Sequence, residues 1–186
     1  MTMCGIVGYI GTEQAAPIIL DGLSKLEYRG YDSAGMAIFD GEKINTRKAV
    51  GRLKVLENLT HGGENMKGTS GIGHTRWATH GAPSDINSHP HMNNAGTIAV
   101  VHNGIIENYI PLKKKMQDKG YQFVSETDTE VLAHLLDYYY KGNPLEAITK
   151  VLHRVEGTYA LGIMFANQQD KNYDARKDSQ LIVGKS

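Results

Sequence analysis

Two strand-like runs on either side of Asp40-Gly41 predict an antiparallel hairpin. Residues 33–39 and 43–50 have strand character, and an Asp-Gly pair between two such runs is a strong hairpin signal. The chain mixes this hairpin with helical segments and shows no regular strand–helix–strand alternation, which a parallel sheet would require. The expected fold class is therefore α+β, with layered sheets.

Apolar runs and helical spacings place the other elements. Strands are expected at residues 3–11, 72–77, 97–101, 158–166 and 181–183. Helices are expected from Pro17 to Gly30 and at residues 52–59, 106–119, 129–141 and 145–155. Thr127 and Glu130 have the spacing of a capping box for the helix at 129–141. Residues 78–96 form a long loop, and a loop of this length in a compact domain usually has a function.

Length and charge narrow the class of protein. The chain has 186 residues, which is enough for one domain that needs neither disulfides nor a metal to fold. Its 20 acidic and 20 basic residues balance, so binding to nucleic acid or to an anionic membrane has no electrostatic support. No run approaches the length of a membrane span, and the first residues do not resemble a signal peptide. We expect a soluble, cytoplasmic domain.

Cys4 is the single cysteine of the chain, so a disulfide framework and a multi-cysteine metal site are excluded. Most free cysteines are small buried apolar residues. If Cys4 became the first residue, its own α-amino group, with an ordinary pKa of about 7.7–8.0, would lie beside the thiol and act as a base. A thiol activated by a terminal amine is a known nucleophile that needs no separate histidine.

The tripeptide His102-Asn103-Gly104 follows a predicted strand and precedes a predicted helix. Asn-Gly is most often a turn, and spacing alone favours that interpretation. Alternatively, the Asn103 side-chain amide and the Gly104 backbone N–H form two donors for an oxyanion.

The run TRWATHG, from Thr75 to Gly81, ends a predicted strand and enters the long loop. Arg76 suits a carboxylate partner, and Trp77 would form one wall of a small pocket. Asp128 either complements a helix dipole or accepts an ammonium group, in which case Arg76 and Asp128 would bind the two charged ends of an α-amino acid. Five histidines lie between residues 74 and 102: His74, His80, His89, His91 and His102. Their spacing is not that of a metal site, so no metal site is expected.

Five ordered motifs together resemble a known family. They are CGIVG from Cys4, EYRGYDSAG from Glu27, the TRWATHG run, HNGIIEN from His102 and SETDTE from Ser125. The chain from Met3 onward resembles the glutaminase (class II glutamine amidotransferase) domains of glucosamine-6-phosphate synthases, the isomerising glutamine–fructose-6-phosphate aminotransferases. This resemblance implies an N-terminal-nucleophile hydrolase fold, a four-layer αββα sandwich.

The resemblance also implies a role for each residue of the motifs. Cys4 would be the nucleophile and its freed amine the base, with Asn103 and Gly104 as the oxyanion hole. Arg76 would bind the glutamine α-carboxylate and Asp128 its α-ammonium group. Further substrate-binding positions are Trp77, Thr79 and His80, which would line the pocket, and Arg29, which would hold the surroundings of the nucleophile.

The implied reaction is hydrolysis of L-glutamine to glutamate and ammonia without a cofactor. In a complete enzyme of this family, ammonia passes to a sugar-phosphate isomerase domain that makes glucosamine 6-phosphate from fructose 6-phosphate. The expected partners are glutamine and that domain, with no nucleic acid and no membrane; a homodimer is an option that the sequence leaves open.

The sequence differs from the family pattern at both ends. Met1-Thr2-Met3 precede Cys4, whereas the family start corresponds to Met3. Residues 1–186 are expected to be one glutaminase domain that is truncated at its C-terminal end, without the sugar isomerase domains. Two other functions stay open: a non-catalytic glutamine-binding fragment in which Cys4 is blocked, and a metal-dependent amidohydrolase.

Overall fold

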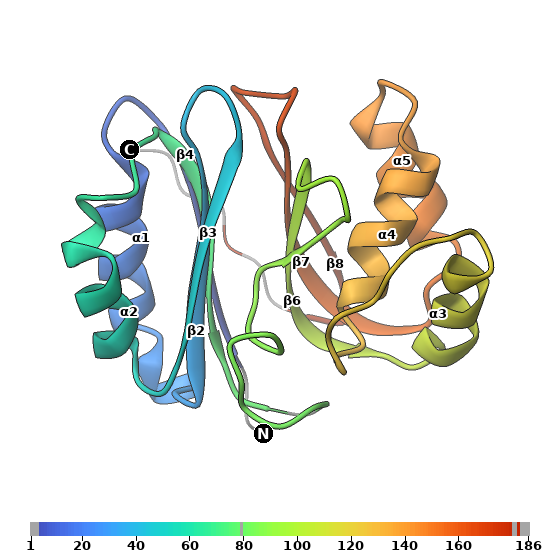
Figure 1. The fold of residues 1–186 in the computed structure, drawn as a ribbon, viewed down its shortest axis with the longest axis horizontal. Helices are drawn as coiled ribbons and strands as arrows, with labels where there is room; N and C mark the ends of the chain where they lie inside the picture. Colours follow the sequence, from blue (N-terminus) through green and yellow to red (C-terminus); the bar gives the residue numbers. More distant parts are fainter. Residues whose placement is uncertain (1–3, 79, 180–181, 183–186) are drawn as a thin grey trace.

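Two antiparallel sheets face each other in the computed structural model, which describes residues 4–78, 80–179 and 182. The first sheet has the strand order β1-β4-β2-β3 and the second the order β5-β6-β7-β8. Helices cover the outer face of each sheet, so the chain forms four layers, helix, sheet, sheet and helix (Figure 1). The predicted α+β class with layered sheets is confirmed.

The first sheet and its helices come from the N-terminal part of the chain. Its elements in chain order are β1 (Gly5–Ile10), α1 (Ala15–Ser24), the 3₁₀ turn η1 (Glu27–Arg29), β2 (Ser33–Phe39), β3 (Ile44–Val50), α2 (Leu53–Leu59), the 3₁₀ turn η2 (His61–Gly63) and β4 (Ser70–Arg76). β2 and β3 pair as the predicted hairpin, with Phe39 opposite Ile44. Every residue of β2 and β4 is buried, because helices cover one face of these strands and the second sheet covers the other.

The second sheet and its helices follow. The elements are β5 (His91–Met92), β6 (Ile98–Ile106), α3 (Tyr109–Gln117), α4 (Glu130–Tyr139), α5 (Pro144–Leu152), β7 (Gly157–Phe165) and β8 (Asn172–Lys177). Helix α4 packs on β6 and lies between α3 and α5, which explains why its first two turns are buried on every side. Helix α5 begins at Pro144, and the Asn143 side chain accepts the Glu146 N–H at 3.2 Å as its N-cap.

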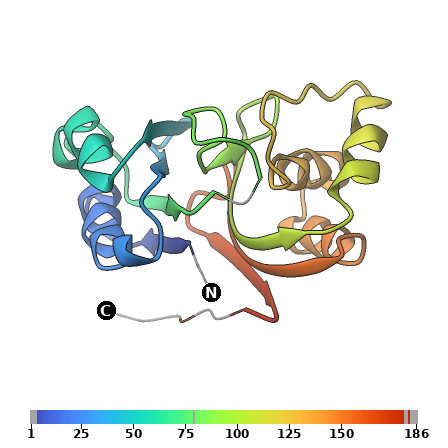
Figure 2. The ribbon, with the colours of Figure 1, turned by 90° about the horizontal axis from the view of Figure 1, so that it is seen from below.

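Three apolar clusters hold the layers together. One lies under α1 and α2, one lies between the second sheet and its helices, and one lies between the two sheets. The members of the inter-sheet cluster are Ala37, Phe39, Ile44, Ile72, Ala99, Val101 and Met164. Figure 2 shows the same layers after a quarter turn, with helices outside both sheets. None of the described helices is long and apolar enough to cross a membrane.

Local expectations around β6 and α3 are wrong. Strand β6 continues to Ile106, through the Asn-Gly pair that was expected to be a turn, and helix α3 starts only at Tyr109. Pairing with the long strand β7 extends β6 in spite of the local turn signal. Strand β8 was not predicted, since its polar sequence lies at a sheet edge. The strand expected at 181–183 falls, except for Ile182, outside the described residues.

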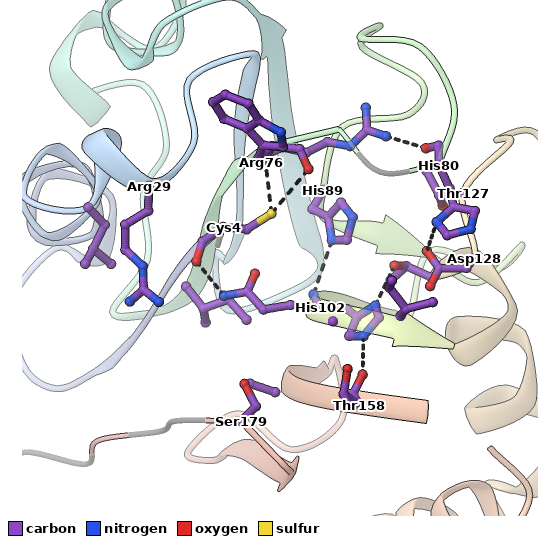
Figure 3. A pocket seen from close by; sticks show the side chains of 18 of the residues that line it. Cys4, Arg29, Arg76, His80, His89, His102, Thr127, Asp128, Thr158 and Ser179 are labelled. Carbon is purple, nitrogen blue, oxygen red and sulfur yellow. Dashed lines mark hydrogen bonds and ion pairs between the residues drawn. The ribbon is translucent and has the colours of Figure 1, made fainter. Parts of the chain in front are cut away.

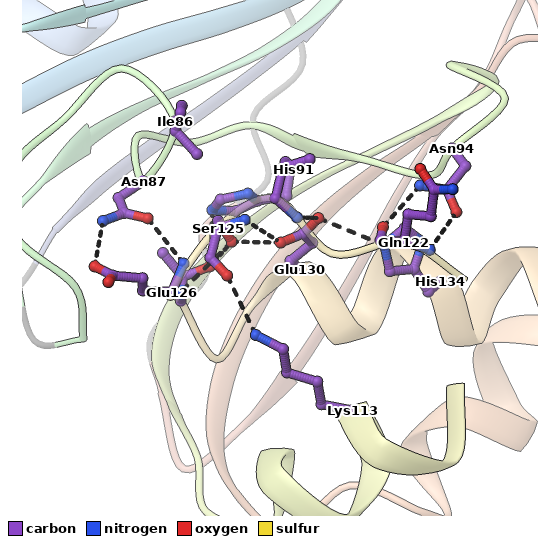
Figure 4. A network of polar contacts seen from close by, with 12 residues as sticks. Ile86, Asn87, His91, Asn94, Lys113, Gln122, Ser125, Glu126, Glu130 and His134 are labelled. Atoms are coloured by element: carbon purple, nitrogen blue, oxygen red, sulfur yellow. Dashed lines mark hydrogen bonds and ion pairs between the residues drawn. The ribbon is translucent and has the colours of Figure 1, made fainter. Parts of the chain in front are cut away.

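The expected capping box is also wrong. Helix α4 begins at Glu130, and its N-cap is Thr129, which makes no side-chain cap. Glu130 instead accepts the backbone N–H groups of Val124 (2.9 Å) and Ser125 (2.7 Å) and the Ser125 hydroxyl (2.6 Å) (Figure 4). Its carboxylate therefore fixes the segment that leads from α3 to α4.

This buried carboxylate makes stability depend on pH. Burial alone would raise the pKa of Glu130, but contacts with His134, Ser125 and Val124 lower it to about 2, from an ordinary 4.5. A carboxyl with a lowered pKa in the folded state stabilises the fold above about pH 4.5, and this contribution disappears as the pH falls toward 2. We expect Glu130→Gln to lower the free energy of unfolding by about 1–3 kcal/mol at pH 6, with a difference from wild type that shrinks below pH 4.5.

Urea unfolding between pH 6 and pH 3 measures this difference. Glu64→Gln is the matched control, because Glu64 is exposed and its substitution should change stability little at any pH. A loss for Glu130→Gln that stays constant over the whole pH range would contradict the assignment.

Candidate active site

A cavity of about 1050 Å³ opens where β1, β4, β6 and β7 come together (Figure 3). Most of the residues singled out from the sequence line it: Cys4, Arg29, Arg76, Trp77, His80, Asn103, Gly104 and Asp128. Thr79 lies outside the described residues. The fold thus brings residues of all five sequence motifs to one site.

Cys4 lies immediately before β1 and contacts the residue that follows β4. Its Sγ accepts the Trp77 backbone N–H at 3.1 Å and lies 3.6 Å from the Trp77 carbonyl oxygen. Burial raises the pKa of the Cys4 thiol, and the Trp77 N–H acts in the opposite direction. Because the net shift is upward, the neutral thiol is favoured, and a nucleophilic Cys4 requires a base close to its sulfur.

Asn103 joins the two sheets at the cysteine. Its Nδ2 donates to the Cys4 carbonyl oxygen at 2.8 Å, and its Oδ1 lies 2.9 Å from Nε2 of His74 on β4. The side chain is therefore held at both ends in the middle of a strand, whereas the sequence favoured a turn at this position.

Gly104 follows Asn103 and has a φ of 129°, a conformation that L side chains rarely adopt. A Cβ atom there would lie 2.1 Å from the Thr158 carbonyl oxygen on the paired strand β7. Two features of the backbone thus require glycine at this position.

The edge of β6 away from β7 carries backbone donors that side chains satisfy. His102 N–H donates to His89 Nδ1 at 3.2 Å, and Ile106 N–H donates to an Asp128 carboxylate oxygen at 2.7 Å. Since alternate residues of a strand direct their N–H groups to the same side, the N–H of Gly104 is expected on this edge as well, between the two. Gly104 lines the cavity.

Arg76 ends β4 with a buried guanidinium group, 3% exposed. Its Nη2 donates to the carbonyl oxygens of His80 and of Gly81, the latter at 3.0 Å. Its Nη1 is buried without a hydrogen-bond partner among the described residues. A buried cationic donor without a partner is costly, so this atom suits an anionic group in the cavity.

Asp128 lies in the segment before α4 and is 4% exposed. One carboxylate oxygen accepts the Ile106 N–H, and the other lies 3.9 Å from Nδ1 of His80 (Figure 3). The carboxylate thus binds the backbone of strand β6 and lies on the wall of the cavity.

Trp77, His80 and Arg29 complete the wall of the cavity. The Trp77 ring meets Tyr31 edge to face, with centroids 5.4 Å apart. His80 comes from the loop after β4, and Arg29 ends the turn η1. Arg29 and His80 lie on opposite sides of Cys4 (Figure 3).

Four buried histidines make contacts other than metal ligation. His74 stacks on His89 with centroids 4.1 Å apart, His89 meets His91 edge to face, and His102 Nδ1 lies 2.9 Å from the Thr129 hydroxyl. Burial lowers the pKa of all four, to about 3 for His74. Within the described part of the chain, no group of three His, Cys, Asp or Glu side chains could hold a metal ion.

The sequence did not single out two residues that organise this site. His74 was considered only as part of a histidine cluster, although it lies two residues before Arg76 on the same strand and hence on the same face. Asp32 accepts the Ala78 N–H and so holds the first residue of the loop after Trp77. Its position in the EYRGYDSAG motif was the available signal.

Comparison with known proteins decides the family. The model of a family described as "Glutamine amidotransferase domain" matches residues 74–179, which is more than half of the chain. The chain belongs to this family. Glutamine hydrolysis is accordingly the activity expected of it.

Two curated relatives of this glutamine amidotransferase domain carry the same name. A glutamine–fructose-6-phosphate aminotransferase (isomerizing) of Caldanaerobacter subterraneus is 63% identical over 182 residues, and one of Thermococcus kodakarensis is 51% identical over 185. Each match covers 98% of this chain but only 30% of the relative.

Solved structures agree on the fold. The glutamine phosphoribosylpyrophosphate amidotransferase of B. subtilis, complexed with ADP and GMP, has a TM-score of 0.74 and 33% identity, covering 88% of this chain and 35% of the other. A glutamine aminotransferase class-II domain protein of Silicibacter pomeroyi, 19% identical with a TM-score of 0.64, covers 97% of this chain and 78% of the other and supports the fold alone. The fold is the αββα sandwich of N-terminal-nucleophile hydrolases, as the resemblance implied.

Proposed function

We propose that this glutamine amidotransferase domain hydrolyses L-glutamine to glutamate and ammonia with Cys4 as the nucleophile. The observation that carries the proposal is one cavity lined by a thiol and by groups of opposite charge. Cys4, Asn103 and Gly104 line it together with Asp128 and with Arg76, whose Nη1 has no hydrogen-bond partner among the described residues. An α-amino acid with a side-chain amide matches this arrangement.

Each step of the proposed reaction has a group to carry it. The freed α-amine of Cys4 takes the thiol proton, and the thiolate attacks the amide carbon of glutamine. Asn103 Nδ2–H and Gly104 N–H stabilise the oxyanion that forms. The amine then gives its proton to the leaving nitrogen, and ammonia departs as the γ-glutamyl thioester forms. Water hydrolyses the thioester and releases glutamate and the free thiol.

Binding of glutamine would use the opposite charges of Arg76 and Asp128. Arg76 Nη1 donates to the α-carboxylate, and Asp128 accepts from the α-ammonium group. Trp77, Thr79 and His80 line the pocket in this proposal, and Arg29 holds the surroundings of Cys4. No cofactor enters any step.

The relatives' name suggests the acceptor of the ammonia. In this proposal residues 1–186 belong to the glutaminase part of an enzyme that transfers ammonia to fructose 6-phosphate and yields glucosamine 6-phosphate. The chain spans about 30% of the length of these relatives, so the sugar-phosphate isomerase part would come from outside this sequence.

The second candidate is a glutamine-binding domain without catalysis, since Met1-Thr2-Met3 precede Cys4. Removal of Met1 alone would expose Thr2 and leave the Cys4 nitrogen in a peptide bond. Such a nitrogen is no base, because its lone pair is delocalised.

The starting residue distinguishes the two candidates. A chain produced from Met3 should lose that methionine, expose Cys4 and hydrolyse glutamine. A chain that retains Thr2 and Met3 should be slower by about 100- to 10,000-fold, the usual contribution of a general base. Glutamate release is measured together with the intact mass of each protein, and Cys4→Ala in the chain from Met3 sets the background. Full activity with Thr2 and Met3 retained would exclude the amine as base.

Replacement of Asn103 tests the oxyanion donor. We expect Asn103→Ala to lower kcat by about 100- to 1000-fold and to change KM little, because an oxyanion donor acts on the transition state. Steady-state kinetics measure both constants. Asn65→Ala is the control, an exposed asparagine away from the cavity. A normal kcat with a raised KM would make Asn103 a binding residue.

Replacement of Asp128 tests recognition of the α-amino group. In Asp128→Asn the amide oxygen still accepts the Ile106 N–H, while the negative charge is lost. We expect kcat/KM for glutamine to fall by about 10- to 100-fold, since a charged hydrogen bond contributes roughly 1.5–3 kcal/mol. Hydrolysis of 4-carbamoylbutanoate, which lacks the α-amino group, should change little. Equal losses for both substrates, with a lowered Tm, would show a structural role instead.

A further inference from the structure

His74 is a buried residue beside the candidate active site that the proposed reaction does not use. One of its ring nitrogens makes two short contacts. His74 lies on β4, is 1% exposed, and its Nε2 is 3.0 Å from the His102 carbonyl oxygen and 2.9 Å from Asn103 Oδ1. A carbonyl oxygen only accepts hydrogen bonds. Nε2 must therefore carry a hydrogen, and it donates that hydrogen toward both oxygens.

The same logic fixes the amide of Asn103. The Cys4 carbonyl oxygen, 2.8 Å away, only accepts, so the atom that faces it is Nδ2. The atom that faces the Nε2–H of His74 is then Oδ1. The two contacts agree on one orientation, and the hydrogen bonds determine it without reference to how the amide atoms are assigned.

The opposite orientation of the amide would reverse both contacts. Nδ2–H would face the Nε2–H of His74, and Oδ1 would face the Cys4 carbonyl oxygen and the space where an oxyanion forms. Two donors or two acceptors in contact repel, and a buried polar group without its partner is costly. His74 thus acts against the orientation in which Asn103 offers no donor at Cys4.

The surroundings of His74 keep the ring in this state. Nδ1 has no partner among the described residues, and the ring stacks on His89 at 4.1 Å. Burial holds the pKa of His74 at about 3, so the ring is neutral near pH 7. A neutral ring whose Nε2 carries the hydrogen has its Nδ1 unprotonated, which agrees with the absence of an acceptor beside Nδ1.

We propose that His74 is a positioning residue. Its Nε2–H, shared between the His102 carbonyl oxygen and Asn103 Oδ1, holds the Asn103 amide with Nδ2 toward the space where the oxyanion forms. The proposal rests on the oxyanion role proposed for Asn103. His74 acts only through Asn103 and is not itself expected to touch glutamine.

Kinetics of His74 variants, in the chain produced from Met3, test this role. Loss of the donor in His74→Leu should lower kcat about tenfold and leave KM unchanged, because one neutral hydrogen bond no longer orients the amide. His74→Gln keeps an N–H donor and should regain most of kcat. Both variants are compared with wild type by circular dichroism, so that only folded protein enters the comparison.

A double-mutant cycle separates positioning from a general packing effect. If His74 acts through Asn103, His74→Leu should change kcat less than twofold in the Asn103→Ala background. His134→Leu is the matched control, since His134 is equally buried but packs in the cluster under the second sheet. Its effect should be the same in both backgrounds.

The tautomer gives a readout that does not depend on activity. Long-range ¹H–¹⁵N correlation spectra of the labelled chain should show His74 with a protonated Nε2 and an unprotonated Nδ1 at pH 7. His74→Gln identifies the signal. This measurement still applies if His74→Leu does not fold.

The outcomes distinguish the two proposals. An equal loss for His74→Leu in both backgrounds, a His74→Gln variant no better than His74→Leu, or a protonated Nδ1 would overturn the positioning role and leave the proposed function standing. An unchanged kcat in Asn103→Ala alone would overturn the oxyanion role of Asn103 and the positioning role with it.

Discussion

Face-to-face packing of the two sheets is the interaction on which the site depends. The apolar cluster between them, which includes Phe39, Ile72 and Met164, fixes the distance between β4 and β6. Cys4, before β1, then meets Asn103 on β6, and His74 on β4 meets the backbone of His102. These polar contacts form at one end of the sandwich because dispersion and burial of apolar surface set the sheets in place along the rest of it.

Polar groups near this end are buried but almost all have partners. Glu130 fixes the segment before α4, the Thr127 hydroxyl lies 3.0 Å from both Ser125 Oγ and His91 Nε2, and His102 binds Thr129. Such networks are rigid when each member is satisfied. Nη1 of Arg76 differs from these groups, because it has no hydrogen-bond partner in the described part of the chain, and Arg76 lines the cavity.

Much of this arrangement could be predicted from the sequence, and the errors have physical causes. The hairpin at Asp40-Gly41 and the presence of helices α1, α2, α4 and α5 follow from local signals, although α1 ends at Ser24, before the Gly30 that was expected to close it. The sequence predicted an end of strand β6 before Asn103 because Asn-Gly has a strong local preference for turns. In the structure, pairing with β7 overrides this preference. Glu130 has the spacing of a capping residue, but its carboxylate binds backbone groups that precede Thr127.

The candidate site residues were singled out because each belongs to a compact motif. Only the folded structure shows that these residues line one cavity, because they are spread over more than 120 positions of the chain; they include Cys4, Arg76, Asn103 and Asp128. The contact of Asp32 with Ala78 joins two motifs, and that of His74 with Asn103 joins one motif to the residue immediately before another. No pattern within a single motif contains that information.

The two oxyanion donors proposed beside Cys4 differ in how they respond to mutation. Asn103 donates from a side chain, so a single base change in its codon can remove the donor and leave the strand intact. The donor proposed at Gly104 is its backbone N–H, and only proline would remove it. Any other residue at 104 keeps the donor but pushes its Cβ against the Thr158 carbonyl. Variation at position 103 therefore changes the chemistry of the site, whereas variation at position 104 changes the pairing of β6 with β7.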